Sequence, residues 1–359
     1  MEALQAATTQ RMIVKRRPSA PTAGGNSLIL ALDAPLNIGI NCTQVLGECF
    51  LIGANEGLFI TSFHSPKVPI NVSGLSAVYH MELLHDLDMM VAISGPQRNL
   101  VILHVADLHA AFKSDMPFVR ATPISGTDHC HLLTIHHDAR KQKRYLCVAD
   151  PDKITLMQFN SRLNIFTTST FIPTAEPATC LLSMPFGIVF GADSFYFVDL
   201  DKLQPVALNI ADCPNDWPLG AVAVSSNEML LAFQNFGVFV DVRGNRTRRE
   251  TVDWEQAPLE FVYALPYLFV VHYDTLEIMQ VAKYEGSDSR GLLNERDVFR
   301  CQNAHFTGRG RTEKEVIFSL SAADRVEVHR FDCSGARKSS LKRRQNHESD
   351  ERKCMKKAA

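Results

Sequence analysis

Residues 46–63, LGECFLIGANEGLFITSF, contain two apolar runs separated by the polar turn Asn55-Glu56-Gly57. Six further segments repeat this pattern of an apolar run, a short turn rich in Gly, Asn, Asp or Pro, and a second apolar run. They are residues 87–105, 144–159, 185–200, 229–242, 267–281 and 316–331. Successive turns lie 39 to 54 residues apart, and one four-stranded propeller blade takes about 40 to 45 residues. The repeat predicts an all-β fold, a seven-bladed β-propeller with one such hairpin in each blade.

The apolar runs are nearly continuous on both sides of most turns, as in residues 145–149 and 187–190. Such strands must be covered on both faces, which occurs in parallel α/β sheets as well as between packed blades. Turns of three to six residues join only antiparallel neighbours, because parallel strands need long crossovers. The turns therefore exclude a doubly wound α/β sheet and favour a ring in which each blade lies between two others.

Three local features refine this prediction. Gly57 and Gly237 stand where a left-handed residue would close a hairpin. Helical periodicity in residues 78–84 and 107–112 predicts two short helices on loops between blades. The isolated apolar run at residues 28–32 is expected to return to the last hairpin and complete the final blade.

Charge is segregated along the chain. Residues 1–26 have a formal net charge of +3 and residues 334–359 one of +6, which leaves -2 - 3 - 6 = -11 for the segment between them. We expect a disordered basic N-terminal segment (1–26), one propeller domain (27–333) and a disordered basic tail (334–359). An acidic body disfavours nucleic acid as the main partner.

The nine cysteines are scattered and form no C-x-x-C pair. This argues against zinc and redox motifs and favours a reducing compartment. The sequence shows neither a signal peptide nor an apolar run of membrane-spanning length. We expect a cytoplasmic protein without a transmembrane segment.

Known catalytic motifs are missing from the sequence: a G-x-S-x-G elbow, a G-x-x-x-x-G-K phosphate loop and the kinase set of Gly-rich loop, H-R-D and D-F-G. We therefore expect no enzymatic activity and no cofactor. The alternative is a propeller enzyme with a site in the central channel. Such an enzyme would carry several ionisable residues on its innermost strands, and the runs in this chain are mostly aliphatic.

Two groups of histidines have spacings that bear on metal binding. His80 and His85 are five residues apart, so on a helix they would diverge by about 140°. His129 and His131 would project to the same side of a strand, a spacing that can hold a metal ion, but the apolar residues that follow favour a half-exposed blade strand. We expect neither group to bind metal.

A polar string at residues 243–250 follows an apolar strand and is a candidate partner-binding loop. Its arginines are Arg243, Arg246, Arg248 and Arg249. Arginine-bearing surface loops are typical protein-contact sites, although a solvated loop explains the string equally well. Trp254, which comes next, starts an aromatic segment that we interpret as packing between blades, with an exposed recognition patch as the alternative.

These same segments are similar to the citron-homology (CNH) domain family. The similar stretches are FGVFVD at 236–241, the arginine string, Trp254, LPYLFV at 265–270 and NEGLF at 55–59. The resemblance extends over about residues 40–332 and is strongest to members from citron-type kinases. It marks a set of family-motif positions that we expect to be structural: Gly57, Gly237, Phe239, Asp241, Trp254, Pro266 and Tyr267.

The resemblance implies a non-catalytic propeller that mediates protein interactions. For citron-type members it implies two kinds of partner, a Rho-family small GTPase and cytokinesis scaffold proteins of the cleavage furrow and midbody. It also implies that the chain is a fragment or a short product, since it lacks the other domains of such kinases. Similar propellers occur in vesicle-tethering proteins, where a helical solenoid follows, but the tail of this chain has too few large apolar residues to pack one.

Overall fold

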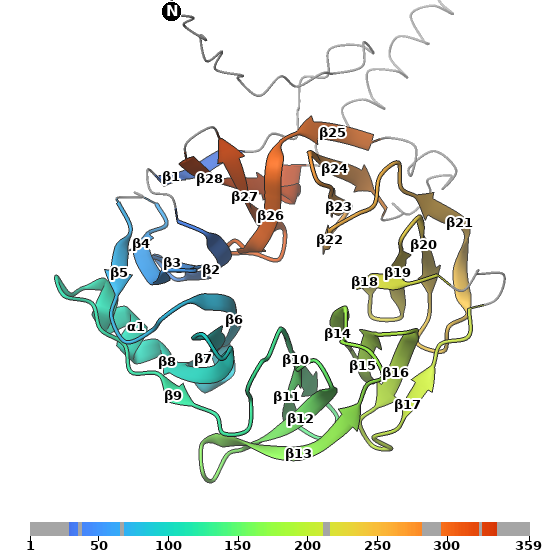
Figure 1. The fold of residues 1–359 in the computed structure, drawn as a ribbon, viewed down its shortest axis with the longest axis horizontal. Coiled ribbons are helices and arrows are strands. Elements are labelled where there is room, and N and C mark those ends of the chain that lie inside the picture. The colour runs from blue at the N-terminus through green and yellow to red at the C-terminus, as the bar shows by residue number, and fades with distance from the viewer. Residues whose placement is uncertain are drawn as a thin grey trace, which may run out of the picture.

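The computed structural model describes residues 29–34, 38–64, 68–210, 216–281, 296–322 and 325–335. In these residues the strands form seven four-stranded antiparallel sheets, arranged as blades around a central axis (Figure 1). The predicted seven-bladed β-propeller is confirmed.

Six blades use four consecutive strands that run from the innermost to the outermost position. Blade 1 comprises β2 (Ile40–Leu46), β3 (Cys49–Ala54), β4 (Gly57–Ser62) and β5 (Ile70–Val72). Blade 2 comprises β6 (Val78–Leu84), β7 (Met89–Ser94), β8 (Asn99–His104) and β9 (Thr122–Pro123). Blade 3 comprises β10 (Leu132–Asp138), β11 (Lys143–Ala149), β12 (Lys153–Asn160) and β13 (Ile165–Pro173).

The next three blades repeat this order. Blade 4 comprises β14 (Cys180–Met184), β15 (Gly187–Gly191), β16 (Phe195–Asp199) and β17 (Pro205–Ala207). Blade 5 comprises β18 (Pro218–Ser225), β19 (Glu228–Phe233), β20 (Phe236–Val240) and β21 (Arg246–Asp253). Blade 6 comprises β22 (Glu260–Ala264), β23 (Tyr267–Val271), β24 (Thr275–Gln280) and β25 (Arg296–Arg300). The seven hairpins seen in the sequence are thus the two middle strands of each blade.

Blade 7 is built from both ends of the described chain. Its first three strands are β26 (Gln302–Arg309), β27 (Glu315–Ala322) and β28 (Arg325–Asp332), and its outer strand is β1 (Ile29–Ala34). β1 pairs antiparallel with β28, from Ile29 opposite Arg330 to Ala34 opposite Val326. The expected return of the N-terminal apolar run to the last hairpin is confirmed, and this pairing covers a strand that would otherwise be a sheet edge.

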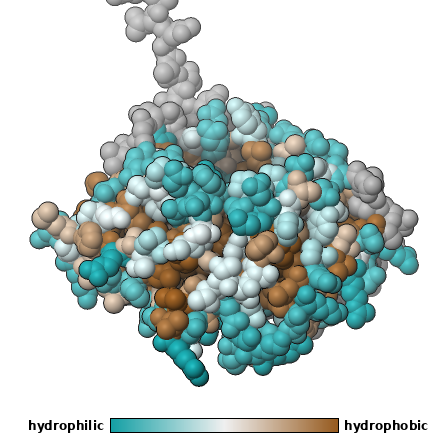
Figure 2. All heavy atoms as spheres, turned by 60° about the horizontal axis from the view of Figure 1, so that its bottom comes forward, coloured by the Kyte–Doolittle hydropathy of each residue, from teal (hydrophilic) through white to brown (hydrophobic). Residues whose placement is uncertain are grey.

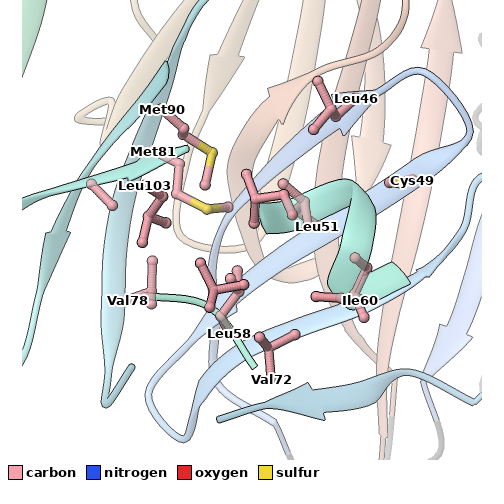
Figure 3. Close-up of a cluster of buried hydrophobic side chains, with 14 of the residues drawn as sticks. Leu46, Cys49, Leu51, Leu58, Ile60, Val72, Val78, Met81, Met90 and Leu103 are labelled. Carbon is pink, nitrogen blue, oxygen red and sulfur yellow. The ribbon is translucent and has the colours of Figure 1, made fainter. Parts of the chain in front are cut away.

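The apolar core is divided into seven clusters, one at each interface between neighbouring blades. Side chains of a middle strand alternate between the two interfaces because successive residues of a strand point to opposite faces. In β3, Cys49 and Leu51 join the cluster with blade 2 (Figure 3), whereas Phe50 and Ile52 join the cluster with blade 7. This alternation explains why the middle strands are apolar at almost every position.

Of the two predicted helices, one is present. The helix α1 (Val105–Phe112) covers residues 107–112 and packs Leu108 and Ala111 into the cluster between blades 1 and 2. It takes up part of the long interval between the second and third hairpins. Two 3₁₀ turns, η1 (His85–Leu87) and η3 (Cys333–Gly335), complete the helical residues that the structure describes.

The helix predicted for residues 78–84 is wrong, because this segment is the innermost strand β6. Its buried residues, Val78, Met81 and Leu84, are spaced by three, which imitates helical periodicity. The pairing of β6 with β7 shifts register between Val78 and His80, so the strand does not follow a simple alternation. Short patterns of this kind do not separate a helix from an irregular strand.

Hydrogen bonds place the linkers between blades on the same face as the turns between second and third strands. Gly95 N–H in the turn of blade 2 donates to Ala77 of the preceding linker (2.8 Å), and Trp254 N–H donates to Asn235 in the turn of blade 5 (3.1 Å). The remaining turns, between first and second and between third and fourth strands, lie on the opposite face because neighbouring strands are antiparallel.

Ring closure by β1 gives the first prediction. A chain that begins at Ile38 should unfold at a lower temperature than one that begins at Ile29, because β28 loses its ladder partner. Each lost backbone hydrogen bond costs about 1 kcal/mol, and each kcal/mol lowers the unfolding temperature by about 2–4 °C. Loss of a few such bonds should therefore lower the midpoint by an amount on the order of 10 °C in a thermal scan monitored by circular dichroism. Equal midpoints for the two chains would contradict the closing role of β1.

Candidate interaction surfaces and central channel

The arginine string is mainly a strand and not a loop. Residues Arg246–Asp253 form β21, the outer strand of blade 5, and only 241–245 make a turn. Val240 of β20 pairs directly with Arg246. The prediction of a surface loop through residue 250 is therefore wrong. The polar sequence suggests a loop, but an outermost blade strand is solvated on one side and needs no continuous apolar run.

Arg248 is held inside the protein. Its side chain is 8% exposed, and its Nε donates to Glu228 Oε1 at 2.9 Å. Nη1 donates to the carbonyl oxygen of Val281 in blade 6 at 2.6 Å, and the guanidinium lies 3.9 Å from the ring centroid of Phe239. These contacts tie blade 5 to blade 6, so Arg248 has a structural role.

The other three arginines of the string differ in exposure. Arg246 is half-buried, and its Nε and Nη2 have no hydrogen-bond partner among the described residues. Arg243 and Arg249 are exposed. Arg243 is placed by the turn that Asp241 caps, with Asp241 Oδ1 accepting the Arg243 N–H at 2.8 Å and the Asn245 N–H at 2.9 Å.

Asp241 is an ionised cap in this turn. Burial raises the pKa of its carboxyl group, but hydrogen bonds from the side chain and backbone of Asn245 and the backbone of Arg243 outweigh burial and hold the pKa below its usual value. The carboxylate thereby fixes the turn that carries Arg243, and Arg243 and Arg249 are the arginines of the string that a partner can reach.

The remaining motif residues of blade 5 pack together. Phe239 is buried beneath Arg248. Trp254 is buried as well, donates from Nε1 to the Phe233 carbonyl oxygen at 3.0 Å, and lies 5.4 Å from Phe261 between ring centroids. A Cβ atom at Gly237 would come within 2.9 Å of the indole. Gly237 lies inside β20 without a left-handed φ, so its predicted turn conformation is wrong, and its position instead leaves room for Trp254.

Gly57, Pro266 and Tyr267 occupy other blades. Gly57 has a φ of 131°, as predicted for the turn of blade 1. The Pro266 carbonyl oxygen accepts the Val281 N–H at 3.0 Å. Tyr267 is half-buried and its ring centroid lies 6.0 Å from that of Phe331 in blade 7.

The innermost strands are more polar than expected. The innermost strands carry ionisable residues, including His80 and Glu82 on β6, His136 on β10, Glu260 on β22 and His305 on β26. The prediction of mostly aliphatic innermost strands is wrong, because the apolar runs in the sequence belong to the middle strands. Strands at the centre have no neighbouring strand on their inner side, and all of these side chains except the buried His136 are half-buried, so the innermost strands tolerate polar residues.

One polar group joins three blades across the closure of the ring. His305 Nδ1 is hydrogen-bonded to Glu260 Oε1 of blade 6, and His305 Nε2 lies 2.9 Å from the carbonyl oxygen of Asn41 in blade 1. Glu260 Oε2 also accepts the Phe306 N–H at 2.7 Å. Burial lowers the pKa of His305, but the hydrogen bond and charge of Glu260 and the Asn41 carbonyl outweigh it, so the pKa is raised.

The histidines considered as metal ligands are separated. His80 lies on β6 and His85 in the η1 turn. His129 is in a turn with a φ of 59° and β10 begins only at residue 132, so the strand predicted through His129 and His131 is wrong. His131 Nε2 instead lies 2.8 Å from the Ala178 carbonyl oxygen of the next linker. Within the described ranges, no three His, Cys, Asp or Glu side chains gather as metal ligands.

The cysteines that the structure describes are unpaired with one another. Burial raises the pKa of the Cys147 and Cys333 thiols to about 12, so they remain protonated at neutral pH and act as small apolar side chains.

The two faces of the ring carry different charge. The face made by the turns between second and third strands and the linkers between blades is here called the acidic face. Its described segments hold nine carboxylates and one arginine, Arg98, whereas those of the other face hold eight carboxylates and nine Lys and Arg. The nine carboxylates belong to Glu56, Asp128, Asp150, Asp152, Glu176, Asp193, Asp216, Glu255 and Asp274.

The outer rim exposes scattered apolar side chains. Leu163, Phe171 and Val206 are more than half exposed near or on the outer strands β13 and β17. Figure 2, in which these strands come forward, shows apolar residues in small groups between hydrophilic ones. Exposed apolar residues that do not form one continuous patch are normal for a protein surface.

The described residues therefore form a closed propeller of the kind that supports recognition on its faces and rim. The family profile described as "CNH domain" matches residues 47–296, and the chain belongs to this family. None of the helices in the described ranges has the length and apolar content needed to cross a membrane.

Individual relatives agree with this assignment. The chain is 30% identical over 330 residues to "Citron rho-interacting kinase" from Rattus norvegicus, covering 85% of this chain and 15% of the relative. It is 23% identical over 261 residues to "Serine/threonine-protein kinase MRCK gamma" from Homo sapiens, covering 68% of this chain and 16% of the relative. The chain thus spans less than one fifth of either kinase. Among solved structures, the "AfRom2 CNH domain" shares the fold, with a TM-score of 0.68 and 16% identity over 85% of this chain and 98% of that one.

Arg248→Ala should destabilise the propeller by about 3 kcal/mol, because it removes the ion pair between Arg248 and the largely buried Glu228 and the contact with Phe239. The urea unfolding midpoint is the measurement. Arg249→Ala, one residue away and exposed, is the matched control and should change stability by less than about 0.5 kcal/mol. Equal effects would show that Arg248 is not the structural arginine.

The raised pKa of His305 gives a pH dependence. A raised pKa in the folded state means stabilisation that is fully present below the unfolded pKa of about 6.5 and is lost as the pH rises through the folded value. The His305 and Glu260 side chains are both partly exposed to solvent, so their ion pair stabilises the folded protein by less than about 1 kcal/mol. The stability difference between the natural protein and His305→Gln should shrink between pH 6 and pH 9 in urea titrations. A difference that grows with pH would contradict this assignment.

Proposed function

We propose that this chain is a non-catalytic protein-interaction propeller that docks a Rho-family small GTPase, cytokinesis scaffold proteins, or both. The observation that carries the proposal is the similarity to citron Rho-interacting kinase over 85% of this chain, compared with 68% for MRCK gamma. The ring would then work in the cytoplasm, at the cleavage furrow and the midbody. It requires no cofactor for this role.

The exposed arginines of blade 5 are the proposed GTPase contact. Arg243 lies in a turn fixed by the Asp241 carboxylate and Arg249 lies on the adjacent outer strand. Two exposed guanidinium groups on a rigid strand and turn suit an acidic protein surface, because arginine binds carboxylates in a bidentate manner. Arg248 supports this surface from below and is not itself a contact.

The test is binding of the purified chain to a Rho-family GTPase loaded with GDP or with a non-hydrolysable GTP analogue, followed by calorimetry. The double variant Arg243→Glu/Arg249→Glu should weaken binding at least tenfold, because two favourable charges become repulsive. Arg162→Glu, an exposed arginine in the turn between third and fourth strands of blade 3, is the matched control and should change affinity less than twofold.

Two outcomes would contradict the proposal at different levels. Absence of binding in both nucleotide states removes the GTPase as a direct partner. Binding that is equally weakened by Arg162→Glu and by the double variant removes the blade 5 surface as its site.

A further inference from the structure

We propose that the acidic face, at blades 5 and 6, binds a Lys- and Arg-rich protein segment that also carries large apolar residues. This inference rests on the proposed function of an interaction propeller, but it concerns a different surface and a partner of opposite charge to that expected at Arg243 and Arg249.

Three large apolar side chains stand out on this face. Trp217 is 44% exposed, Leu259 63% and Tyr273 77%. Trp217 directly precedes β18, Leu259 precedes β22, and Tyr273 lies in the turn between β23 and β24. The three therefore come from two neighbouring blades at the same face of the ring, and Trp and Tyr are the residue types most enriched at interaction hot spots.

Hydrogen bonds hold the segments that carry Leu259 and Tyr273 together. Leu259 N–H donates to the Val271 carbonyl oxygen at 2.7 Å, and His272 Nδ1 lies 3.4 Å from the Ala257 carbonyl oxygen. The linker that carries Leu259 is thus bonded to the turn that carries Tyr273. Rigid presentation lowers the entropy lost when a partner binds.

Each of the three has a carboxylate close in the chain. Asp216 precedes Trp217, Glu255 lies in the linker of Leu259, and Asp274 follows Tyr273. Among the described residues, none of these carboxylates forms an ion pair. Within the described ranges, the nine carboxylates of this face make one ion pair, between Asp150 and Lys153 at 3.2 Å. Their charge is therefore available to a cationic partner.

The carboxylates and the exposed apolar side chains of the acidic face together indicate the kind of partner. Nine carboxylates against one arginine repel nucleic acid and attract cations over a long range. The absence of a three-residue metal cluster in the described ranges argues for a polycation and not a single metal ion. Exposed Trp and Tyr among the carboxylates favour a segment with its own apolar residues, since apolar contacts give affinity while charge gives steering and specificity.

The experiment measures fluorescence anisotropy of a labelled 15-residue peptide of Lys, Leu and Trp with the full chain. Two control peptides replace every Lys by Glu, or every Leu and Trp by Ser. The first peptide should bind, the Glu peptide should not, and the Ser peptide should bind at least fivefold more weakly. Binding should weaken as the salt concentration rises.

Variants locate the binding surface. Glu255→Lys/Asp274→Lys should weaken binding at least tenfold, and Tyr273→Ser at least fivefold. The matched controls are Glu313→Lys, an exposed carboxylate of the other face, and Phe171→Ser, an exposed aromatic residue of the rim. Both should change affinity less than twofold. Equal losses in test and control variants, or no binding of the first peptide, would overturn the proposal.

Two further outcomes separate related explanations. In the first, the full chain binds the peptide only after the nine Lys and Arg of residues 334–359 are replaced by Gln. That result would mean that the chain's own tail occupies the acidic face, and it would overturn the proposal that a separate protein binds there. If Arg243→Glu/Arg249→Glu abolishes GTPase binding but leaves peptide binding intact, the two surfaces are independent. Failure of the natural chain to bind the GTPase in either nucleotide state would therefore remove the GTPase proposal and leave this one standing.

Discussion

Every blade of this propeller depends on a neighbour on each side. The middle strands place alternate apolar side chains into two separate interfaces, as β3 does with Leu51 toward blade 2 and Ile52 toward blade 7. An open row of blades would lose one such interface and expose the two blade faces that form it, at a cost of about 25 cal/mol for each Å² of apolar surface. The ring must therefore close.

Closure is made by contacts between residues far apart in the sequence. β1 adds the outer strand to blade 7, and the cluster between blades 7 and 1 includes Ile317 and Val328 from one side and Phe50 from the other. On the channel side, His305 reaches both Glu260 and the Asn41 carbonyl. Polar contacts on the inner strands and apolar contacts on the middle strands thus both stabilise the blades at which the ring closes.

The elements predicted best from the sequence are the middle strands, because their own residues reveal them. Continuous apolar runs reveal the middle strands because burial on two sides leaves no polar positions. The innermost strands are harder to recognise, since β6 has buried residues at every third position and β26 has only two buried residues of eight. The outer strand β21 resembles a loop because its arginines and threonines are polar.

The functional surfaces depend on long-range contacts that composition does not show. Arg248 is a structural residue because Glu228, 20 residues before it, and Val281, 33 residues after it, accept hydrogen bonds from its guanidinium group. The acidic face is invisible as a motif because its carboxylates are spread over many short turns and linkers, such as those of Glu56, Asp152 and Asp274. Only the ring brings them to the same face, which also carries Trp217 and Tyr273.

The most direct test of this account is amide hydrogen exchange of β28 in the native protein, followed by mass spectrometry. The third strands of the other six blades pair with an outer strand that follows them directly in the chain, whereas β28 relies on β1. If the ring is closed, β28 amides exchange as slowly as those of β4, β8, β12, β16, β20 and β24, within about tenfold, because they open with the same cooperative unit. Exchange of β28 orders of magnitude faster than in all six other strands would contradict a ring closed by β1.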